Sequence, residues 1–151
     1  IYDFDLAVDR IRAAAEAARS LPFPFALTGR CENLLRGKGD LADTIARLQA
    51  YEAAGADVLF APALRSLDDI RSVLKEVSKP LSVISVMVAG ATVADLAEAG
   101  VRRISIGGAL AQAAYGVLVD GAREMQESGS FGWLAKISPD NDITPYLRGK
   151  D

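Results

Sequence analysis

The residues with the clearest chemical potential follow the first predicted strand. Directly after the apolar run that ends at Thr28, the sequence continues Gly29-Arg30-Cys31-Glu32-Asn33. In parallel α/β folds ligands meet the carboxyl ends of the strands, and a guanidinium there offers a fork of donors to a carboxylate or a phosphate. Arg30 is therefore a candidate anion-binding residue, and Glu32 is a candidate to orient it or to contact the ligand. The alternatives are a structural ion pair for Arg30 and a solvated loop position for Glu32.

The other predicted strand ends are less polar. They carry Ala61-Pro62, Ser85-Val86-Met87 and Gly107-Gly108. Ser85 is a further candidate for contact with a ligand. Gly107 stands at the start of a helix, where backbone N–H groups bind anions, although a lone Gly-Gly pair is more simply a tight strand-to-helix turn. Cys31 has no His to activate it, which favours a buried and inert thiol.

Composition narrows the chemistry of the 151 residues further. The chain has no His, which excludes Ser-His-Asp and Cys-His machinery, and its single Cys excludes an internal disulfide and a cysteine zinc site. The mean hydropathy of +0.17 indicates a packed core rather than disorder. A net charge of -3 predicts neither nucleic-acid nor membrane binding. No apolar run is long enough to cross a bilayer, and a cytoplasmic location fits the single free thiol.

Apolar runs alternate with amphipathic stretches along the chain, and together they predict the strands and helices that position these residues. Apolar runs predict strands near residues 24–29, 57–61, 81–86 and 103–106. Helical spacing and capping residues predict helices at about 5–20, 40–54, 66–77, 92–99 and 109–127. Buried strands bounded by helices predict a parallel sheet with the helices outside it. Residues 1–135 form one predicted structural unit, and 136–151 form a C-terminal arm.

Two architectures are built from such units. A (β/α)8 barrel needs about 250 residues, so this chain holds only four of its eight units. The alternative, which length alone favours, is a small open parallel sheet with helices on both faces. An open-sheet domain of that kind is typical of nucleotide or effector binding, but no glycine-rich fingerprint follows the first strand.

Three segments resemble motifs of the isocitrate lyase/phosphoenolpyruvate mutase superfamily. Leu27–Glu32 is similar to its ARTD/ARTE strand-end motif, and residues 42–57 are similar to its A-x-x-R-x-x-A-Y-x-x-A-G-A-D segment, with Arg47 in register. Residues 96–107 resemble its L-A-x-x-G-V-x-R-I-S-x-G segment. The segments lie in the family's order, span most of the chain and are most similar to a divergent bacterial branch.

The resemblance implies the C-terminal half of a (β/α)8 barrel, with strands five to eight. Members of the superfamily are Mg²⁺-dependent and make or break C–C or P–C bonds next to the enolate of a 2-oxo acid, whose oxygens the metal stabilises. Arg30 matches the arginine that contacts the substrate's carboxylate or phosphonate. The resemblance also implies a homo-oligomer that exchanges a C-terminal helix, here 109–127 or the segment after it.

Departures from the family pattern limit the expected activity. The metal ligands and the Lys-Cys-Gly-His loop of the lyases belong to the first half of the barrel, so no catalytic residue and no metal ligand is expected in this segment. Pro62 stands where the lyases have a Glu, and Ile84–Met87 stands where they have Asn-Met-Thr-Glu. These differences predict a substrate other than isocitrate, such as a smaller 2-oxo acid or a phosphonopyruvate-like compound.

A non-catalytic barrel used for binding or oligomerisation is the alternative. The start at Ile1, without Met and before a helix, favours a fragment that is inactive without its N-terminal half.

Overall fold

The computed structural model describes residues 1–137 and 144–147. The chain divides into two compact units, Ile1–Gly107 and Gly108–Asp151. The predicted division into residues 1–135 and an arm at 136–151 stays a prediction, because most of that arm lies outside the described residues.

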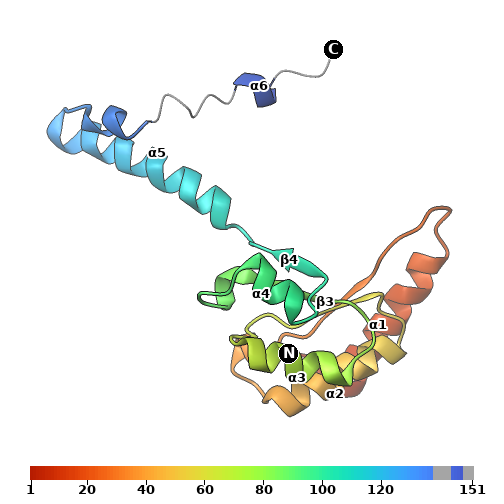
Figure 1. The fold of residues 1–151 in the computed structure, drawn as a ribbon. Helices are drawn as coiled ribbons and strands as arrows, with labels where there is room; N and C mark the ends of the chain where they lie inside the picture. The colour runs from red at the N-terminus through yellow and green to blue at the C-terminus, as the bar shows by residue number, and fades with distance from the viewer. Residues whose placement is uncertain (138–143, 148–151) are drawn as a thin grey trace. The chain divides into compact units, whose positions relative to one another are not determined.

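In the first unit, helices and strands alternate along the chain (Figure 1). The strands are β1 (Thr28–Arg30), β2 (Val58–Phe60), β3 (Leu81–Ile84) and β4 (Arg103–Ser105). The α-helices are α1 (Phe4–Arg19), α2 (Leu41–Ala53), α3 (Leu67–Glu76) and α4 (Val93–Glu98). Two short 3-10 helices, η1 (Leu34–Arg36) and η2 (Ser85–Met87), follow the ends of β1 and β3.

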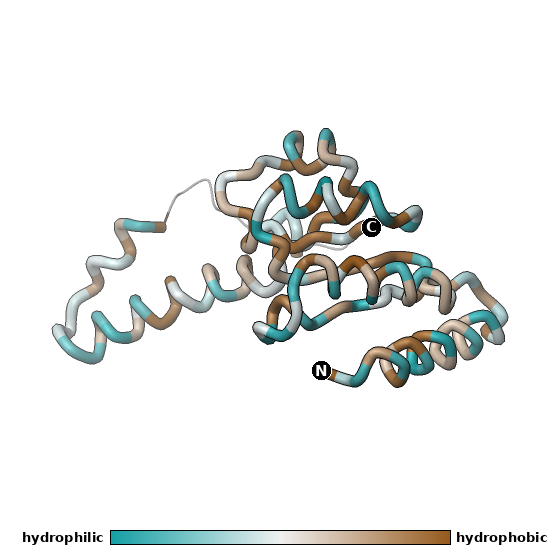
Figure 2. Tube along the Cα trace, turned by 90° about the horizontal axis from the view of Figure 1, so that it is seen from below, coloured by the Kyte–Doolittle hydropathy of each residue, from teal (hydrophilic) through white to brown (hydrophobic). Residues whose placement is uncertain are grey.

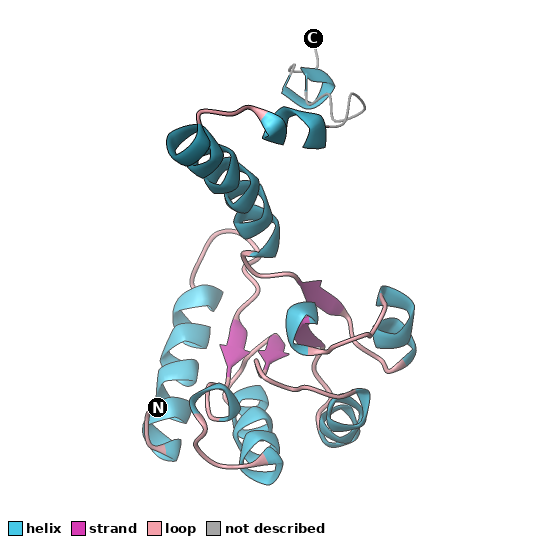
Figure 3. Cartoon of the chain, turned by 90° about the vertical axis from the view of Figure 1, so that its left-hand side faces the viewer, coloured by secondary structure: helices cyan, strands magenta, loops and turns pink. Residues whose placement is uncertain are grey.

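The four strands form one parallel sheet in the order β1-β2-β3-β4. Parallel crossovers are right-handed, so a strictly sequential order places all the crossover helices on one side of the sheet. Helices on both faces require a reversal of strand order, which this sheet does not have. Figure 3 shows the helices arranged around the strands. The predicted α/β class is confirmed, with four parallel strands in an open sheet as in half of a (β/α)8 barrel.

The hydrophobic core lies on the helix side of this sheet. Leu59 of β2 and Leu81 of β3 are fully buried and pair in register, and they belong to one cluster with Leu48 of α2 and Ile70 of α3. The helices are amphipathic: hydrophilic and hydrophobic stretches alternate along the helix beside the label N in Figure 2, which is α1. Burial of such faces supplies most of the stability of helices this short.

Capping residues set the starts of three helices. The side chains of Asp40, Ser66 and Thr92 accept hydrogen bonds from backbone N–H groups three residues later, at 2.9, 3.0 and 3.1 Å. These are the N-cap interactions that satisfy otherwise unpaired donors at a helix start. The predicted starts of α2, α3 and α4 are confirmed to within one or two residues.

Two strands differ from their predicted limits by more than one residue. The first begins at Thr28 rather than near 24, because Pro24 has no N–H to donate and Phe25 is more than half exposed. Asp57 holds the chain before β1, since its carboxylate accepts a hydrogen bond from the N–H of Leu27 at 2.8 Å. The third strand stops at Ile84 rather than 86, because the Ser85 carbonyl accepts the N–H of Val88 at 2.9 Å and closes a turn.

The second unit is built on helix α5 (Ala109–Ser128), followed by the 3-10 helix η3 (Gly132–Lys136) and the short helix α6 (Thr144–Leu147). The indole of Trp133 packs directly against Gly121, the residue of α5 that is buried. The carboxylate of Glu124 accepts hydrogen bonds from the Ser130 hydroxyl and the Gly132 N–H, which fold η3 back along α5. Within the described part of the chain, none of the helices combines the length and hydropathy needed to cross a bilayer.

Candidate functional site

Arg30 is the last residue of β1 and lies at the edge of the sheet where the parallel strands have their carboxyl ends. It pairs in register with Phe60 of β2, and its guanidinium carbon lies 5.0 Å from the centre of the Phe60 ring. This is cation–π contact distance. The side chain remains about half exposed, at 49%, so the ring orients the guanidinium without removing its donors from solvent.

Glu32 holds the other side of Arg30. Its carboxylate accepts a hydrogen bond from Arg30 Nε and forms a second ion pair with Arg36 Nε at 3.3 Å. Partial burial raises the pKa of Glu32, but hydrogen bonds and charge from the two arginines outweigh it and lower the pKa below its usual value. Glu32 is therefore ionised at neutral pH. A single contact between Arg30 Nε and Glu32 is both the ion pair and the orienting interaction that the sequence suggested. It leaves the other two guanidinium nitrogens of Arg30 available.

A cavity of about 690 Å³ opens beside this pair. Its lining includes four cationic residues and one acidic residue, which are Arg30, Arg36, Lys38, Arg47 and Glu32. The chain as a whole is acidic, so this is a local concentration of positive charge. Convergent guanidinium and ammonium donors suit an anionic ligand, such as a carboxylate, a phosphonate or a phosphate.

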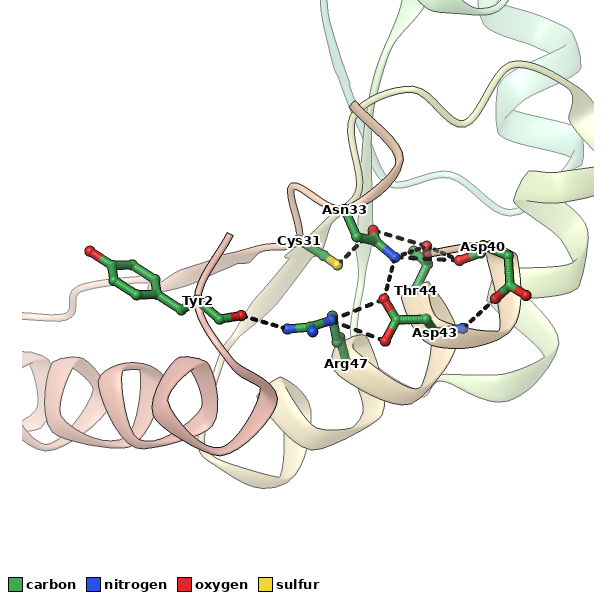
Figure 4. Close-up of polar contacts among 7 residues, drawn as sticks. All are labelled: Tyr2, Cys31, Asn33, Asp40, Asp43, Thr44 and Arg47. Carbon is green, nitrogen blue, oxygen red and sulfur yellow. Dashed lines mark hydrogen bonds and ion pairs between the residues drawn. The ribbon is translucent and has the colours of Figure 1, made fainter. Parts of the chain in front are cut away.

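A buried polar network fixes the loop that carries these cations (Figure 4). The side-chain amide of Asn33 donates to Asp43 Oδ2 and to Thr44 Oγ1, both at 2.8 Å. Its carbonyl oxygen accepts from Thr44 Oγ1 at 3.0 Å and from the Cys31 thiol at 3.0 Å. Asn33 and Thr44 are fully buried. The strand-end loop is thereby tied to the first turns of α2.

Arg47 extends this network to the start of α1. Its Nε donates to both carboxylate oxygens of Asp43, at 3.2 and 3.1 Å, and Nη1 donates to the Tyr2 carbonyl at 3.4 Å. Its guanidinium also lies 5.4 Å from the centre of the Phe4 ring. Burial lowers the pKa of Arg47, but the Asp43 carboxylate outweighs this and raises the pKa above its ordinary value. Arg47 is a permanent cation that joins α1 to α2 at the cavity wall.

Cys31 is buried between β1 and the Asn33 network. Burial raises the pKa of its thiol, even though the hydrogen bond with Asn33 acts in the opposite direction. A protonated, buried thiol is not a nucleophile. The structure therefore supports the expected inert role for Cys31.

Ser85 and Gly107 lie at the ends of β3 and β4, but neither lines the cavity beside Arg30. Ser85 begins η2 and is half-buried. The N–H of Gly107 donates to Ser105 Oγ at 3.1 Å, so an internal acceptor already occupies the donor that was considered for an anion. Gly107 has φ +57°, and a Cβ there would lie 3.0 Å from Ile84 Cδ1, so the position requires glycine.

Three cationic residues of the cavity wall are not predicted from the sequence as ligand contacts: Arg36, Lys38 and Arg47. Arg36 and Lys38 alternate with Gly37 and Gly39 in the loop after β1. A pair of cations between flexible glycines, next to a strand end, is the signal that points to them. Asn33 gave no such signal, because its importance depends on contacts with a helix about ten residues later.

No group of three or more His, Cys, Asp or Glu side chains that could hold a metal ion occurs within residues 1–137 and 144–147. Glu32 of the cavity lining is engaged by Arg30 and Arg36, and Asp43 is engaged by Arg47. The residues present thus do not fit a Mg²⁺ site by themselves.

Comparison with known proteins places the chain in a family. Residues 1–126 match the family model described as phosphoenolpyruvate phosphomutase. A crystal structure from Burkholderia cenocepacia J2315, provisionally described as a lyase/mutase, is 47% identical, with a TM-score of 0.89 over the whole of this chain and 55% of its own. A second protein from that organism, provisionally described as a phosphonomutase, is 34% identical, with a TM-score of 0.73 over 82% of this chain and 52% of its own.

More distant relatives agree with this placement. The structure of 2,3-dimethylmalate lyase, a member of the PEP mutase/isocitrate lyase superfamily, is 26% identical, with a TM-score of 0.78 over 93% of this chain and 50% of its own. An uncharacterized protein of Mycobacterium tuberculosis is 37% identical over 73 residues, which are 48% of this chain and 28% of that protein. The chain spans about half the length of the solved structures that it matches. The family match and these structures together show that the chain belongs to the PEP mutase/isocitrate lyase superfamily.

Proposed function

We propose that the protein carrying this chain is a lyase or mutase that acts on a 2-oxo acid or a phosphonopyruvate-like substrate through an enolate intermediate. The observation that carries the proposal is the position of Arg30, half exposed at a strand end and bordering a cavity with a surplus of cations. Superfamily membership supplies the reaction class, cleavage or formation of a C–C or P–C bond.

In this proposal the chain's own residues bind and orient the substrate's anionic group. Arg30 offers the guanidinium nitrogens that Glu32 does not use, and Phe60 and Glu32 hold its side chain in place. Arg36 and Lys38 add positive charge at the cavity wall, which favours negative charge that develops on the substrate. Ser85 and Gly107 remain weaker candidates for contact with the substrate.

The superfamily is generally metal-dependent, and a bound Mg²⁺ supplies charge stabilisation at enolate oxygens. The described residues do not form a site for it, so we propose that its ligands lie outside this chain. We likewise propose that the chain is the C-terminal half of a barrel. The solved relatives are about twice as long, and within residues 1–107 the strand order places the crossover helices on one side of the sheet.

The test is turnover by the full-length protein with Mg²⁺ and a panel that includes oxaloacetate and phosphonopyruvate. Arg30→Ala removes the guanidinium and is expected to lower kcat/KM by roughly 100- to 1,000-fold on the substrate that is turned over. Arg30→Lys keeps the charge without the fork and should recover part of the loss. Arg71→Ala is the matched control, because Arg71 lies on α3 in an exposed pair with Asp68. Normal turnover by Arg30→Ala would contradict the role of Arg30.

A second candidate function is binding without catalysis. Pro62 and the η2 turn, residues 85–87, follow β2 and β3 where the lyases carry polar side chains. Titration calorimetry with Mg²⁺ and the same panel separates the two functions. Metal-dependent heat of binding without any turnover supports the binding protein, whereas turnover supports the enzyme.

We also propose that α5 mediates assembly with other subunits. Within its own unit, Leu110, Val117 and Leu118 of this helix are each more than 60% exposed. An apolar stripe of this size is typical of a face that is covered by another surface.

A further inference from the structure

The open face of the sheet, opposite the hydrophobic core, carries one continuous row of side chains. Arg30 pairs in register with Phe60, Phe60 pairs with Ser82, and Ser82 pairs with Arg103. Residues paired in register on parallel strands point to the same side. The neighbouring residues Leu59 and Leu81 point to the core, so this row of four residues faces away from the helices.

The two ends of the row differ in how their charge is balanced. Arg30 has the Glu32 carboxylate. Arg103 donates from Nη1 to the Ser82 hydroxyl at 3.0 Å, and Ser82 is fully buried. Among the residues that the structure describes, no carboxylate lies within ion-pair distance of Arg103. The neutral Ser82 hydroxyl accepts a hydrogen bond from one of the five N–H donors of Arg103, but it does not balance the positive charge of the guanidinium.

Arg103 lies at the other end of this row from Arg30 and does not line the cavity beside Arg30. It is the first residue of β4, whereas Arg30 is the last residue of β1. The stagger of neighbouring strands brings both into one row, as in a barrel whose strands are tilted. Arg103 is therefore at the amino-terminal side of the sheet. In barrels, residues on that side contribute to the stability of the fold and do not bind substrate. The substrate's anionic group cannot be its partner.

Closure of the barrel encloses this row. A guanidinium removed from water without an opposite charge is strongly unfavourable, and an arginine in that position is found with a carboxylate. We propose that the surface covering the open face, supplied by the remaining barrel units of the same polypeptide, presents an Asp or Glu carboxylate to Arg103. The resulting ion pair joins the two halves of the barrel. The proposal rests on the half-barrel part of the proposed function and not on the assigned reaction.

The test is the thermal stability of the full-length protein from about pH 5.5 to about pH 8. Arg103→Met leaves the partner carboxylate enclosed and unpaired, which raises its pKa in the folded state. A group with a raised folded pKa stabilises the protein at low pH and loses that contribution as pH rises. The deficit in Tm relative to wild type is therefore expected to grow with pH, to roughly 6–15 °C at the alkaline end.

Arg102→Met is the matched control, because it removes the same charge from the adjacent, exposed arginine. It should show a small deficit that is the same at every pH. Arg103→Lys keeps the charge and should follow the wild-type pH profile. If Arg103→Met does not fold at neutral pH, the refolding yields at the two ends of the pH range replace Tm, and a higher yield at low pH is expected.

Three results would overturn the proposal. A deficit for Arg103→Met that does not change with pH means that the covering acceptors are neutral. No deficit at any pH means that Arg103 is not enclosed. Conversion of a native oligomer to monomers by Arg103→Met means that a second copy of the chain covers the face. None of these readouts depends on turnover, so they are distinguishable from a failure of Arg30→Ala to change activity.

Discussion

At the scale of single residues, Asn33 connects the anion-binding loop to the rest of the molecule. Its buried amide makes hydrogen bonds with Asp43, Thr44 and Cys31. Asn33→Ala removes these hydrogen bonds in a place that water does not reach. The Cys31 thiol loses its acceptor, whereas Asp43 keeps Arg47 and Thr44 keeps the Asp40 carbonyl, so we expect a loss of about 2–3 kcal/mol in the free energy of unfolding.

Urea unfolding measures this loss. Gln49→Ala is the matched control, because it removes an exposed amide that donates to the Glu76 carbonyl at 2.8 Å. Its expected effect is within about 0.5 kcal/mol. Equal losses in the two variants would show that the network around Asn33 contributes no more than a surface hydrogen bond.

The Cys31 thiol gives a second prediction at this scale. Its pKa is raised by burial, so the folded protein keeps the proton that the unfolded chain loses above about pH 8.5. The sign follows from linkage: stability is unaffected below the usual thiol pKa and falls as pH rises beyond it. Alkylation of the peptide containing Cys31 should be much slower in the native protein than in urea. Equal rates at pH 8 would place the thiol at the surface.

How far the sequence predicts the site depends on the range of the interactions. Arg30 could be placed at a strand end because the apolar run before it and the loop after it are local signals. The roles of Asn33 and Arg47 could not. Asn33 meets Thr44 only when the loop after β1 folds against α2, and Arg47 meets Tyr2 only when α1 and α2 pack together. The close approach of Gly107 to Ile84 likewise joins residues more than twenty positions apart, so no local signal predicts it.

At the scale of elements, capping residues determine where helices begin. The Ser66 hydroxyl accepts the N–H of Asp69 at the start of α3, whereas the Ser72 hydroxyl donates to the Asp68 carbonyl inside the same helix. Ser66→Ala should cost about 1 kcal/mol, because an N–H at the helix start loses its acceptor. Ser72→Ala is the same chemical change in the helix interior and should be neutral or slightly stabilising, since Ala has the higher helix propensity.

Chemical denaturation of the two variants, side by side, checks this difference. Similar losses for Ser66→Ala and Ser72→Ala would mean that capping does not set the start of α3.

Element limits show the same division between local and distant causes. The starts of α2, α3 and α4 follow from Asp40, Ser66 and Thr92, which act within one turn, so the sequence predicts them closely. Strand limits depend on the neighbouring strand. β3 pairs with β4 only as far as Ile84 opposite Ser105, and no local pattern distinguishes Ile84 from the apolar Val86 that follows it.

At the scale of the whole molecule, the sequence predicts the order of the four strand–helix units, and the strand order of the sheet settles the architecture. A doubly wound sheet and half a barrel share the same local pattern. They differ in whether the strand order reverses, and this depends on which strands pair. The observed order β1-β2-β3-β4 has no reversal, which places the crossover helices of residues 1–107 on one side of the sheet, as in a barrel.

Helix α5 carries the last prediction at this scale. Leu110, Val117 and Leu118 fall within one face at helical spacing and are each more than 60% exposed, whereas Trp133 packs against Gly121 on that face. A charge at Leu118 would lie in the middle of any interface formed there, where an unpaired carboxylate is unfavourable. We therefore expect Leu118→Glu to shift the full-length protein from oligomer to monomer, measured by light scattering after gel filtration.

Gln112→Glu is the control for this shift. It adds the same charge on the opposite side of α5, at a residue that is exposed. Wild-type mass for Gln112→Glu together with monomer mass for Leu118→Glu ties assembly to the apolar face rather than to charge on the helix. If Leu118→Glu keeps the wild-type mass, α5 is covered within its own polypeptide, and the contacts between subunits must be formed by other elements.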